Sequence, residues 1–291
     1  MTSRFAGALG IRVHRDPGGG NPVTASEYNA TVIQRVEIAP GLIILRVAPD
    51  VLPFRFEPGQ YTVLGLRRAE PRVAGADAEE PASDPDSMIR RAYSIASSSK
   101  ADEYIEFYIT LVASGELTPR LLKLSVRDRL FIGTKATGLF TLDRVRDERH
   151  VLLVATGTGL APYMSMLRSE LVCGGPRRFV ILQGARYSWD LGYRTELETL
   201  DRLCSNVNYI PVVSRPREDP TWKGLGGYLQ DVLVSETIRE RTGLDVAPGN
   251  FHIFLCGNPG MIIEATRRMS ERGFVPDKGR TIGSLHTEKY W

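Results

Sequence analysis

The segment at residues 155–162 has the residue types that bind a pyrophosphate. It reads Ala-Thr-Gly-Thr-Gly-Leu-Ala-Pro and directly follows an apolar run at residues 150–156 that predicts a strand. Gly157 and Gly159 allow the backbone to approach a phosphate, and the helix expected after them offers free N–H groups. Pro162 suits a first helical turn, but it replaces the third glycine of the G-x-G-x-x-G pattern, so a plain strand–helix turn fits equally well.

Arginines stand at the ends of the next two predicted strands. One strand is followed by Ala185 and Arg186, and the other ends with Ser214 and Arg215. An NAD-binding domain would carry an acid at the second strand end to hold the ribose hydroxyls, whereas arginines and a hydroxyl suit a 2′-phosphate. The pattern favours NADP over NAD, although exposed arginines without a role would look the same.

A second group of residues, Arg91-Ala92-Tyr93-Ser94, combines three useful side chains. An arginine can pair with a phosphate, a tyrosine can lie flat against a ring, and a serine hydroxyl can reach a ring nitrogen. In a strand, Arg91 and Tyr93 share one face and can reach one extended ligand. Taken alone, an ordinary strand with a packed tyrosine explains the residues better.

Cys256 precedes Gly257, Asn258 and Pro259, which open a helix at the end of another predicted strand. That position is the ligand-binding edge of an open α/β sheet. Free cysteine is usually a small buried hydrophobe. The sequence alone therefore favours a core role for Cys256; if it does act at this edge, we expect positioning and electrostatics, with no covalent chemistry.

The cysteines and histidines predict no metal centre. Cys173 and Cys204 lie in no motif, and the chain's three cysteines form no C-x-x-C pair or cluster spacing. The four histidines show no metal-ligand spacing. A sparse, odd set of cysteines is typical of a reducing compartment, so we expect a cytoplasmic protein whose redox chemistry needs a borrowed cofactor.

These residues need two different scaffolds. Short runs with frequent turns before residue 142 predict an antiparallel β-barrel or sandwich, of which we take the barrel. Apolar strands alternating with helices after that point predict a parallel sheet covered on both faces. We expect an extension at 1–27, a barrel domain at 28–146 and an α/β domain at 147–291. The acidic stretch at 69–87 is interpreted as a solvated insertion between two strands.

The net charge excludes few functions and requires no particular kind of partner. The 291 residues carry a net charge of +3, which requires no nucleic-acid partner. No apolar run approaches the roughly 20 residues of a membrane span.

Five motifs in a fixed order resemble those of the ferredoxin–NADP reductase family, over residues 28–291. They are the segments 91–94, 115–121, 157–162, 213–215 and 255–259. The ending at 288–291, Glu-Lys-Tyr-Trp, is similar to the bacterial subclass, whose chain stops in an aromatic residue. The resemblance implies an FAD-binding barrel, an NADP-binding domain, and electron exchange between NADP(H) and ferredoxin or flavodoxin.

The resemblance also implies roles for single residues. Those implied to bind FAD are Arg91, Ala92, Tyr93, Ser94, Gly115, Leu117, Thr118, Tyr290 and Trp291. Those expected to bind NADP are Gly157, Thr158, Gly159, Pro162, Arg186, Ser214, Arg215, Gly257, Asn258 and Pro259. Catalytic roles are implied for Ser94 near flavin N5, for Cys256 beside nicotinamide C4, and for Tyr290 on the flavin.

The chain end and one departure from the family bear on nucleotide binding. We expect Trp291 on the FAD adenine, and we expect Tyr290 and Trp291 to gate nicotinamide entry because a free chain end moves easily. Lys223 stands where bacterial members often have a further arginine. A lysine is a point charge rather than a guanidinium fork, which leaves the strength of the NADP preference open.

Two other functions stay open. One is the reductase component of an oxygenase system with a separate ferredoxin, and the other is a non-catalytic, flavin-binding regulatory protein. Ser94, Cys256 and the glycine loop argue against the second. Acidic carrier proteins would be steered by arginines near the flavin edge. The candidates are Arg67, Arg68, Arg90 and Arg120. We expect a monomer.

Overall fold

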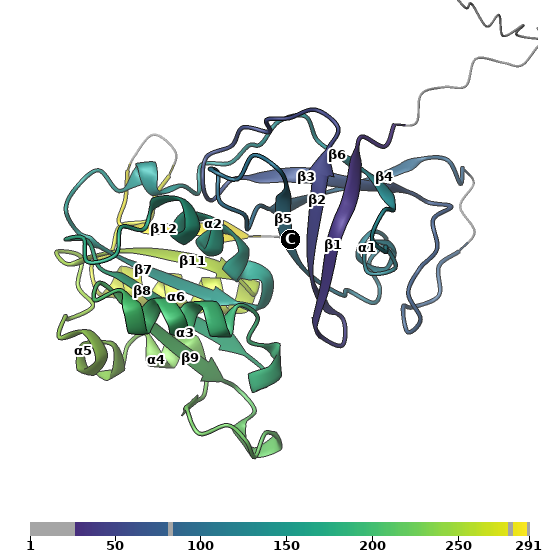
Figure 1. Ribbon diagram of the computed structural model, residues 1–291. Coiled ribbons are helices and arrows are strands. Elements are labelled where there is room, and N and C mark those ends of the chain that lie inside the picture. The colour runs from purple at the N-terminus through teal and green to yellow at the C-terminus, as the bar shows by residue number, and fades with distance from the viewer. Residues whose placement is uncertain (1–26, 81–83, 279–281, 290–291) are drawn as a thin grey trace, which may run out of the picture.

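Two six-stranded sheets organise the chain (Figure 1). The computed structural model describes residues 27–80, 84–278 and 282–289. The first sheet is antiparallel, with strand order β4-β3-β6-β1-β2-β5. The second is parallel, with order β10-β9-β8-β7-β11-β12. The predicted fold class is confirmed.

The first sheet encloses an apolar core. Its elements are β1 (Ala30–Ala39), β2 (Leu42–Pro49), β3 (Tyr61–Arg67), β4 (Met88–Ser94), β5 (Ile105–Thr110), the short helix α1 (Thr118–Leu121) and β6 (Arg129–Ile132). Leu45, Leu64 and Phe107 are fully buried in this core, and Leu121 of α1 closes it. β4 pairs with β3, so that Arg91 lies opposite Leu64 and Tyr93 opposite Thr62, and this pairing fixes the place of both side chains.

The second sheet has helices on both faces, as its apolar strands require. Its strands are β7 (His150–Thr156), β8 (Phe179–Ala185), β9 (Val207–Val213), β10 (Leu225–Gly226), β11 (Phe251–Gly257) and β12 (Leu285–Lys289). Its helices are α2 (Ala161–Glu170), α3 (Arg194–Leu203), α4 (Leu229–Val232), α5 (Thr237–Thr242) and α6 (Pro259–Glu271). Single 3₁₀ turns are η1 (Leu142–Arg144), η2 (Gly157–Leu160), η3 (Ser188–Asp190) and η4 (Pro216–Glu218).

Two elements differ from the sequence patterns. The helical pattern that begins at residue 227 corresponds to two short helices, α4 and α5, in place of one. β12 reads Leu-His-Thr-Glu-Lys, which has too few aliphatic residues to predict a strand. It forms because it pairs in parallel with β11, and that register places Glu288 opposite Cys256.

The two sheets share one apolar cluster. It contains Leu42, Ile44 and Tyr108 of the first sheet together with Leu153 and Ala155 of the second, all buried. The domains therefore pack through a common core. Within the described residues, no helix is long and apolar enough to cross a membrane.

A chain of polar side chains, with two buried histidines at its centre, ties residues 144–147 to β12. His252 contacts His286 at 3.0 Å and the exposed Asp147 at 3.1 Å. His286 lies 3.7 Å from Asp277, which accepts from the Arg144 guanidinium at 2.7 Å. Burial is the main reason that the pKa of both histidines lies below its ordinary value, so the rings stay neutral and hydrogen-bonded near pH 7. This chain holds the strand that carries Glu288.

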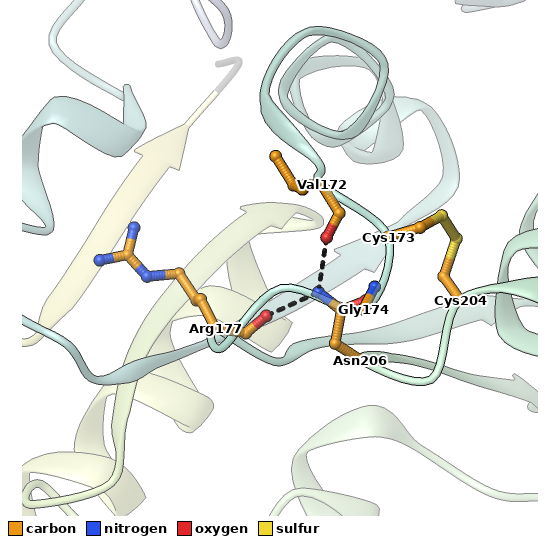
Figure 2. The surroundings of a disulfide bond; sticks show 6 residues. All are labelled: Val172, Cys173, Gly174, Arg177, Cys204 and Asn206. Atoms are coloured by element: carbon orange, nitrogen blue, oxygen red, sulfur yellow. Dashed lines mark hydrogen bonds between the residues drawn. A yellow bond between two sulfur atoms is a disulfide. The ribbon is translucent and has the colours of Figure 1, made fainter.

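Cys173 and Cys204 form a disulfide (Figure 2). Cys173 follows α2 and Cys204 ends α3, so the bond joins the C-terminal ends of two neighbouring helices. The Asn206 side chain organises the same turn, because its oxygen accepts from the Gly174 amide at 2.8 Å and its nitrogen donates to the Val172 carbonyl at 3.0 Å. The bond differs from the expectation of a cysteine set kept reduced.

Candidate functional site

Two loops at the carboxyl edge of the second sheet pack against each other. A Cβ at residue 159 would overlap the Cys256 carbonyl, so Gly159 is required for the approach. Gly257 has φ +124°, a backbone conformation that favours glycine. The Thr156 hydroxyl accepts from the Asn258 amide at 2.7 Å. Asn258 also caps α6, since its side chain accepts from the Met261 amide at 3.2 Å.

A groove of about 980 Å³ runs along these loops. It brings together four residues predicted to bind NADP, namely Thr158, Arg186, Ser214 and Asn258, along with Leu42 and Leu111 of the first domain. Space is open beside Gly157, and the amides of η2 lie next to it. The loop pair and the strand ends thus form one elongated site, which is the shape a dinucleotide needs.

One exposed aromatic residue lines the groove, and a predicted arginine lies outside its described lining. Tyr228 lines it and is 61% exposed. Arg215, which was expected to bind NADP, is absent from that lining; its guanidinium lies 5.8 Å from the Tyr187 ring centroid, and it pairs with Glu218 at 3.7 Å. Tyr228 is a residue for which the sequence patterns suggested no role, although an exposed aromatic beside a nucleotide site is suited to stacking on a base.

The arginines of the first sheet converge on one anionic position. Arg68 and Arg91 each donate to the Glu116 carboxylate at 2.5 Å. These bonds hold the pKa of Glu116 below its ordinary value, with the Arg68 bond the largest cause. The Thr118 hydroxyl lies in the same segment and accepts from the Val112 amide at 3.0 Å. Guanidinium forks that hold a carboxylate here also suit a phosphate, so the donor set fits an FAD pyrophosphate.

The acidic insertion is anchored to this segment and is only partly solvated. Its Val73 amide donates to the Pro119 carbonyl at 2.9 Å, and Glu79 accepts from Arg120 at 2.8 Å. Arg120 is only 4% exposed, so its proposed role in steering a partner is wrong. Arg67 is paired with Asp86 at 3.0 Å, and Arg90 lies over the Phe131 ring at 4.3 Å.

A small polar cluster lies where the two domains meet. The Ser94 hydroxyl, 6% exposed, donates to the Glu288 carboxylate at 3.2 Å, and the buried Cys256 thiol lies 3.9 Å from the same oxygen. Burial raises the pKa of Glu288 to about 7, and the hydrogen bonds from Ser94 and Cys256 act weakly in the opposite direction. Glu288 is therefore a carboxyl group that exchanges a proton near neutral pH.

The other predicted residues divide by their exposure. Ala92 is exposed beside Arg91, while Leu117 and Pro162 are buried within the two segments for which phosphate binding was predicted. Gly115 lies against Thr118. Tyr290 and Trp291, with the proposed gating, lie outside the described residues. Pro259 begins α6 and Lys223 belongs to a loop near Trp222, apart from the groove's described lining.

Comparisons with known proteins match both domains. The family model for the oxidoreductase NAD-binding domain covers residues 153–267. Ferredoxin–NADP reductase B of Sorangium cellulosum is 35% identical over 242 residues, which is 83% of this chain and 88% of the relative. The chain belongs to the ferredoxin–NADP reductase family.

Other members of the ferredoxin–NADP reductase family agree with this assignment. Flavodoxin/ferredoxin–NADP reductase of Escherichia coli is 32% identical over 222 residues, covering 76% of this chain and 81% of that one. The crystal structure of the Neisseria gonorrhoeae ferredoxin NADP⁺ reductase, with bound FAD and NADP, superposes with a TM-score of 0.73 at 20% identity. It covers 92% of this chain and 100% of that chain.

Sequence reasoning missed Glu288, the member of the polar cluster whose pKa is raised to about 7. Glu288 is the first residue of the terminal segment 288–291, in which the family resemblance drew attention only to the aromatic residues. Ser94 and Glu288 are 194 residues apart in the chain. The usable signal was Glu288's place two residues before Tyr290, but only β12 shows that it faces Ser94 and Cys256.

Proposed function

We propose that this chain is an FAD-dependent oxidoreductase that exchanges electrons between NADP(H) and a ferredoxin or flavodoxin in the cytoplasm. The observation that carries the proposal is the meeting of Ser94 from the first domain with Cys256 and Glu288 from the second. This cluster lies at the domain boundary, where the two cofactor sites would meet. Family membership and the donor sets of both domains support it.

Each domain would hold one cofactor. Arg91, with Arg68 and the Gly115–Thr118 segment, binds the FAD pyrophosphate, and Tyr93 lies against the ring system. Burial raises the pKa of the Tyr93 hydroxyl, so this side chain stays neutral. The Gly157–Pro162 loop and the Asn258 end of the groove bind the NADP pyrophosphate, while Tyr228 stacks on the adenine.

FAD, when bound, takes up a hydride from NADPH and passes electrons on one at a time. Ser94 and Cys256, both buried where the two domains meet, would contact the bound rings and exclude water there. Oxidation of NADPH by a one-electron carrier releases one proton. The ionised Glu288 carboxylate accepts that proton through the Ser94 hydroxyl, which already donates to it.

The 2′-phosphate site is proposed at Arg186, Ser214 and Arg215. Arg215 forms an ion pair with Glu218, and the Glu218 carboxylate would compete with a phosphate for the guanidinium. Replacing Arg215→Ala is expected to lower kcat/KM for NADPH about tenfold, as for loss of one charge-assisted hydrogen bond, with little change for NADH. Equal losses with both nucleotides would contradict this assignment.

Three assays test the proposed function. The visible spectrum of the purified protein should show flavin bands, and a colourless protein that cannot be reconstituted with FAD would overturn the proposal. NADPH-dependent ferricyanide reduction should be rapid, whereas a regulatory protein would show none. Acceptor assays with ferredoxins, flavodoxins and oxygenase components then identify the carrier, and a rate that does not change with ionic strength excludes electrostatic steering.

A further inference from the structure

Glu106 is a carboxylate buried between the two domains. It lies on β5 and is 0% exposed. Its carboxylate accepts from Arg46 at 2.6 Å, from Arg168 at 2.5 Å and from the Tyr193 hydroxyl at 2.8 Å. Arg46 is the cross-strand neighbour on β2, whereas Arg168 and Tyr193 belong to the second domain. The contact therefore joins the first domain to α2 and to the start of α3.

The charged and polar partners at this contact keep the Glu106 carboxylate ionised. Burial alone would raise the pKa of Glu106, but the Arg168 charge and the hydrogen bonds from Arg168, Arg46 and Tyr193 lower it below its ordinary value. A buried carboxylate held by two guanidiniums and a phenol has one well-defined geometry, because each donor fixes a direction. A contact of this kind is suited to holding two domains in a fixed orientation.

Helix α2 connects this contact to the nucleotide loop. It is a single ten-residue helix, and its first turn follows the glycine loop η2 directly. Ten helical residues extend about 15 Å. At the other end, Arg168 also donates to the Ala96 carbonyl at 2.9 Å, and the Ser169 hydroxyl accepts from the Ser99 amide at 2.9 Å. Ala96 lies two residues after Ser94, so α2 spans the distance between the nucleotide loop and the segment that carries Ser94.

We propose that Glu106, Arg168 and Tyr193 are positioning residues for hydride transfer. They hold α2 against the Ser94 segment, and in doing so they set the separation between a nicotinamide bound at the glycine loop and a flavin ring bound at Ser94. This inference rests on the proposed function. Hydride transfer needs reacting atoms roughly 3–3.5 Å apart, and a displacement of about 1 Å can lower the rate about 100-fold.

The experiment is stopped-flow reduction of the FAD-loaded protein by saturating NADPH. In Glu106→Gln, the limiting rate of flavin reduction should fall about tenfold or more, and the nicotinamide–flavin charge-transfer absorbance should weaken. The affinity for NADP⁺ should change less than about threefold, because the loop itself is untouched. Reoxidation of chemically reduced protein by ferricyanide should keep its rate, since it needs no nicotinamide.

Glu196→Gln is the matched control. Glu196 also pairs with Arg168, at 2.6 Å, but it lies on α3 in the same domain and is partly exposed. Its loss should leave the limiting rate within about twofold of the wild type. Arg168→Lys keeps the charge but loses the guanidinium fork, so it should slow flavin reduction as Glu106→Gln does.

Several outcomes would overturn the proposal. One is a Glu106→Gln protein that is reduced as fast as the wild type, and another is a Glu196→Gln protein that is slowed as much as Glu106→Gln. If Glu106→Gln does not fold, Tyr193→Phe removes one donor and keeps the ring. It should still slow reduction by about threefold, and an unchanged rate would overturn the proposal. A wild-type flavin that NADPH leaves oxidised would contradict the proposed function itself.

Discussion

Two glutamates lie at the boundary between the same two domains and differ in what surrounds them. Glu106 faces two guanidiniums and a phenol, and its pKa is lowered. Glu288 faces a hydroxyl and a thiol, and burial raises its pKa to about 7. Burial opposes the charge of both carboxylates, so the partners alone decide which one stays ionised.

The difference separates two tasks within one interface. A carboxylate that is always ionised and held by charged donors holds α2 in place but moves no proton at neutral pH. A carboxylate without a described cationic partner can gain and lose a proton, and it contributes little to holding the domains together. The following predictions test whether geometry and proton transfer are divided between these two residues.

The largest expected effect is on the free energy of unfolding in Glu106→Gln. Arg46 and Arg168 would lose their buried counter-charge, which typically costs about 3–5 kcal/mol. Urea unfolding of the holoprotein, followed by flavin fluorescence, measures this loss. Glu196→Gln removes a partly exposed partner of the same arginine and should cost less than about 1 kcal/mol. Similar losses in the two variants would show that the buried Glu106 contact contributes no more to the free energy of unfolding than the partly exposed Glu196 pair.

A second prediction uses the disulfide to test whether a loss of folding stability alone slows flavin reduction. Cys173→Ser opens a link between residues 31 apart in the chain and should lower the free energy of unfolding by about 2–4 kcal/mol. The limiting rate of flavin reduction should stay within about twofold of the wild type, because the Glu106 contact persists. A large loss of rate in Cys173→Ser would mean that stability alone explains the effects of the Glu106 variants.

A third prediction concerns Glu288→Gln and the dependence on pH. With a pKa of about 7, Glu288 is protonated below that pH and can accept a proton above it. Steady-state reduction of a one-electron acceptor by NADPH should therefore increase as the pH rises through about 7. Glu288→Gln should be about 100-fold slower and should lose this increase. An unchanged pH profile would remove Glu288 from proton transfer.

The same variant has an expected effect on stability with a defined sign. A carboxyl whose pKa is raised on folding stabilises the folded state less as the pH rises from about 4.5 to about 7. The wild type should therefore lose more stability across this range than Glu288→Gln. Urea midpoints measured at several pH values test this, and identical pH dependence in both proteins would contradict the raised pKa.

Ser94→Ala removes the hydroxyl through which the proton passes, so turnover should slow as it does in Glu288→Gln. The smallest expected effect is a shift of the residual pH profile in this variant. The Ser94 hydroxyl donates to the Glu288 carboxylate and lowers its pKa, so its loss should raise the pKa further. The midpoint of the profile should move upward by at most about one pH unit, as expected for one hydrogen bond. A downward shift would contradict this contact.

Local patterns were sufficient for the architecture and for most of the candidate site. Short runs and turn residues predicted the strands of the first sheet, and continuous apolar runs predicted β7, β8, β9 and β11 of the second. The glycines at 157, 159 and 257 mark backbone that must pass close to other atoms, which leaves a direct trace in the sequence. The catalytic roles expected for Ser94 and Cys256, by contrast, came from the resemblance of ordered motifs to a family, because each residue taken alone is typical of a packed strand or core.

Only the tertiary structure decided the partners of residues that lie in no recognisable motif. Glu106 is one charged residue within the buried strand β5, Glu288 lies on a strand that no hydrophobic pattern predicts, and Cys173 and Cys204 lie in no motif. The role of Glu106 depends on Arg168, 62 residues away along the chain, and the role of Glu288 depends on Ser94, 194 residues away. The two cysteines depend on each other across 31 residues. A side chain's type follows from the sequence, but its pKa and its partner depend on which distant residues the fold brings within a few ångströms of it.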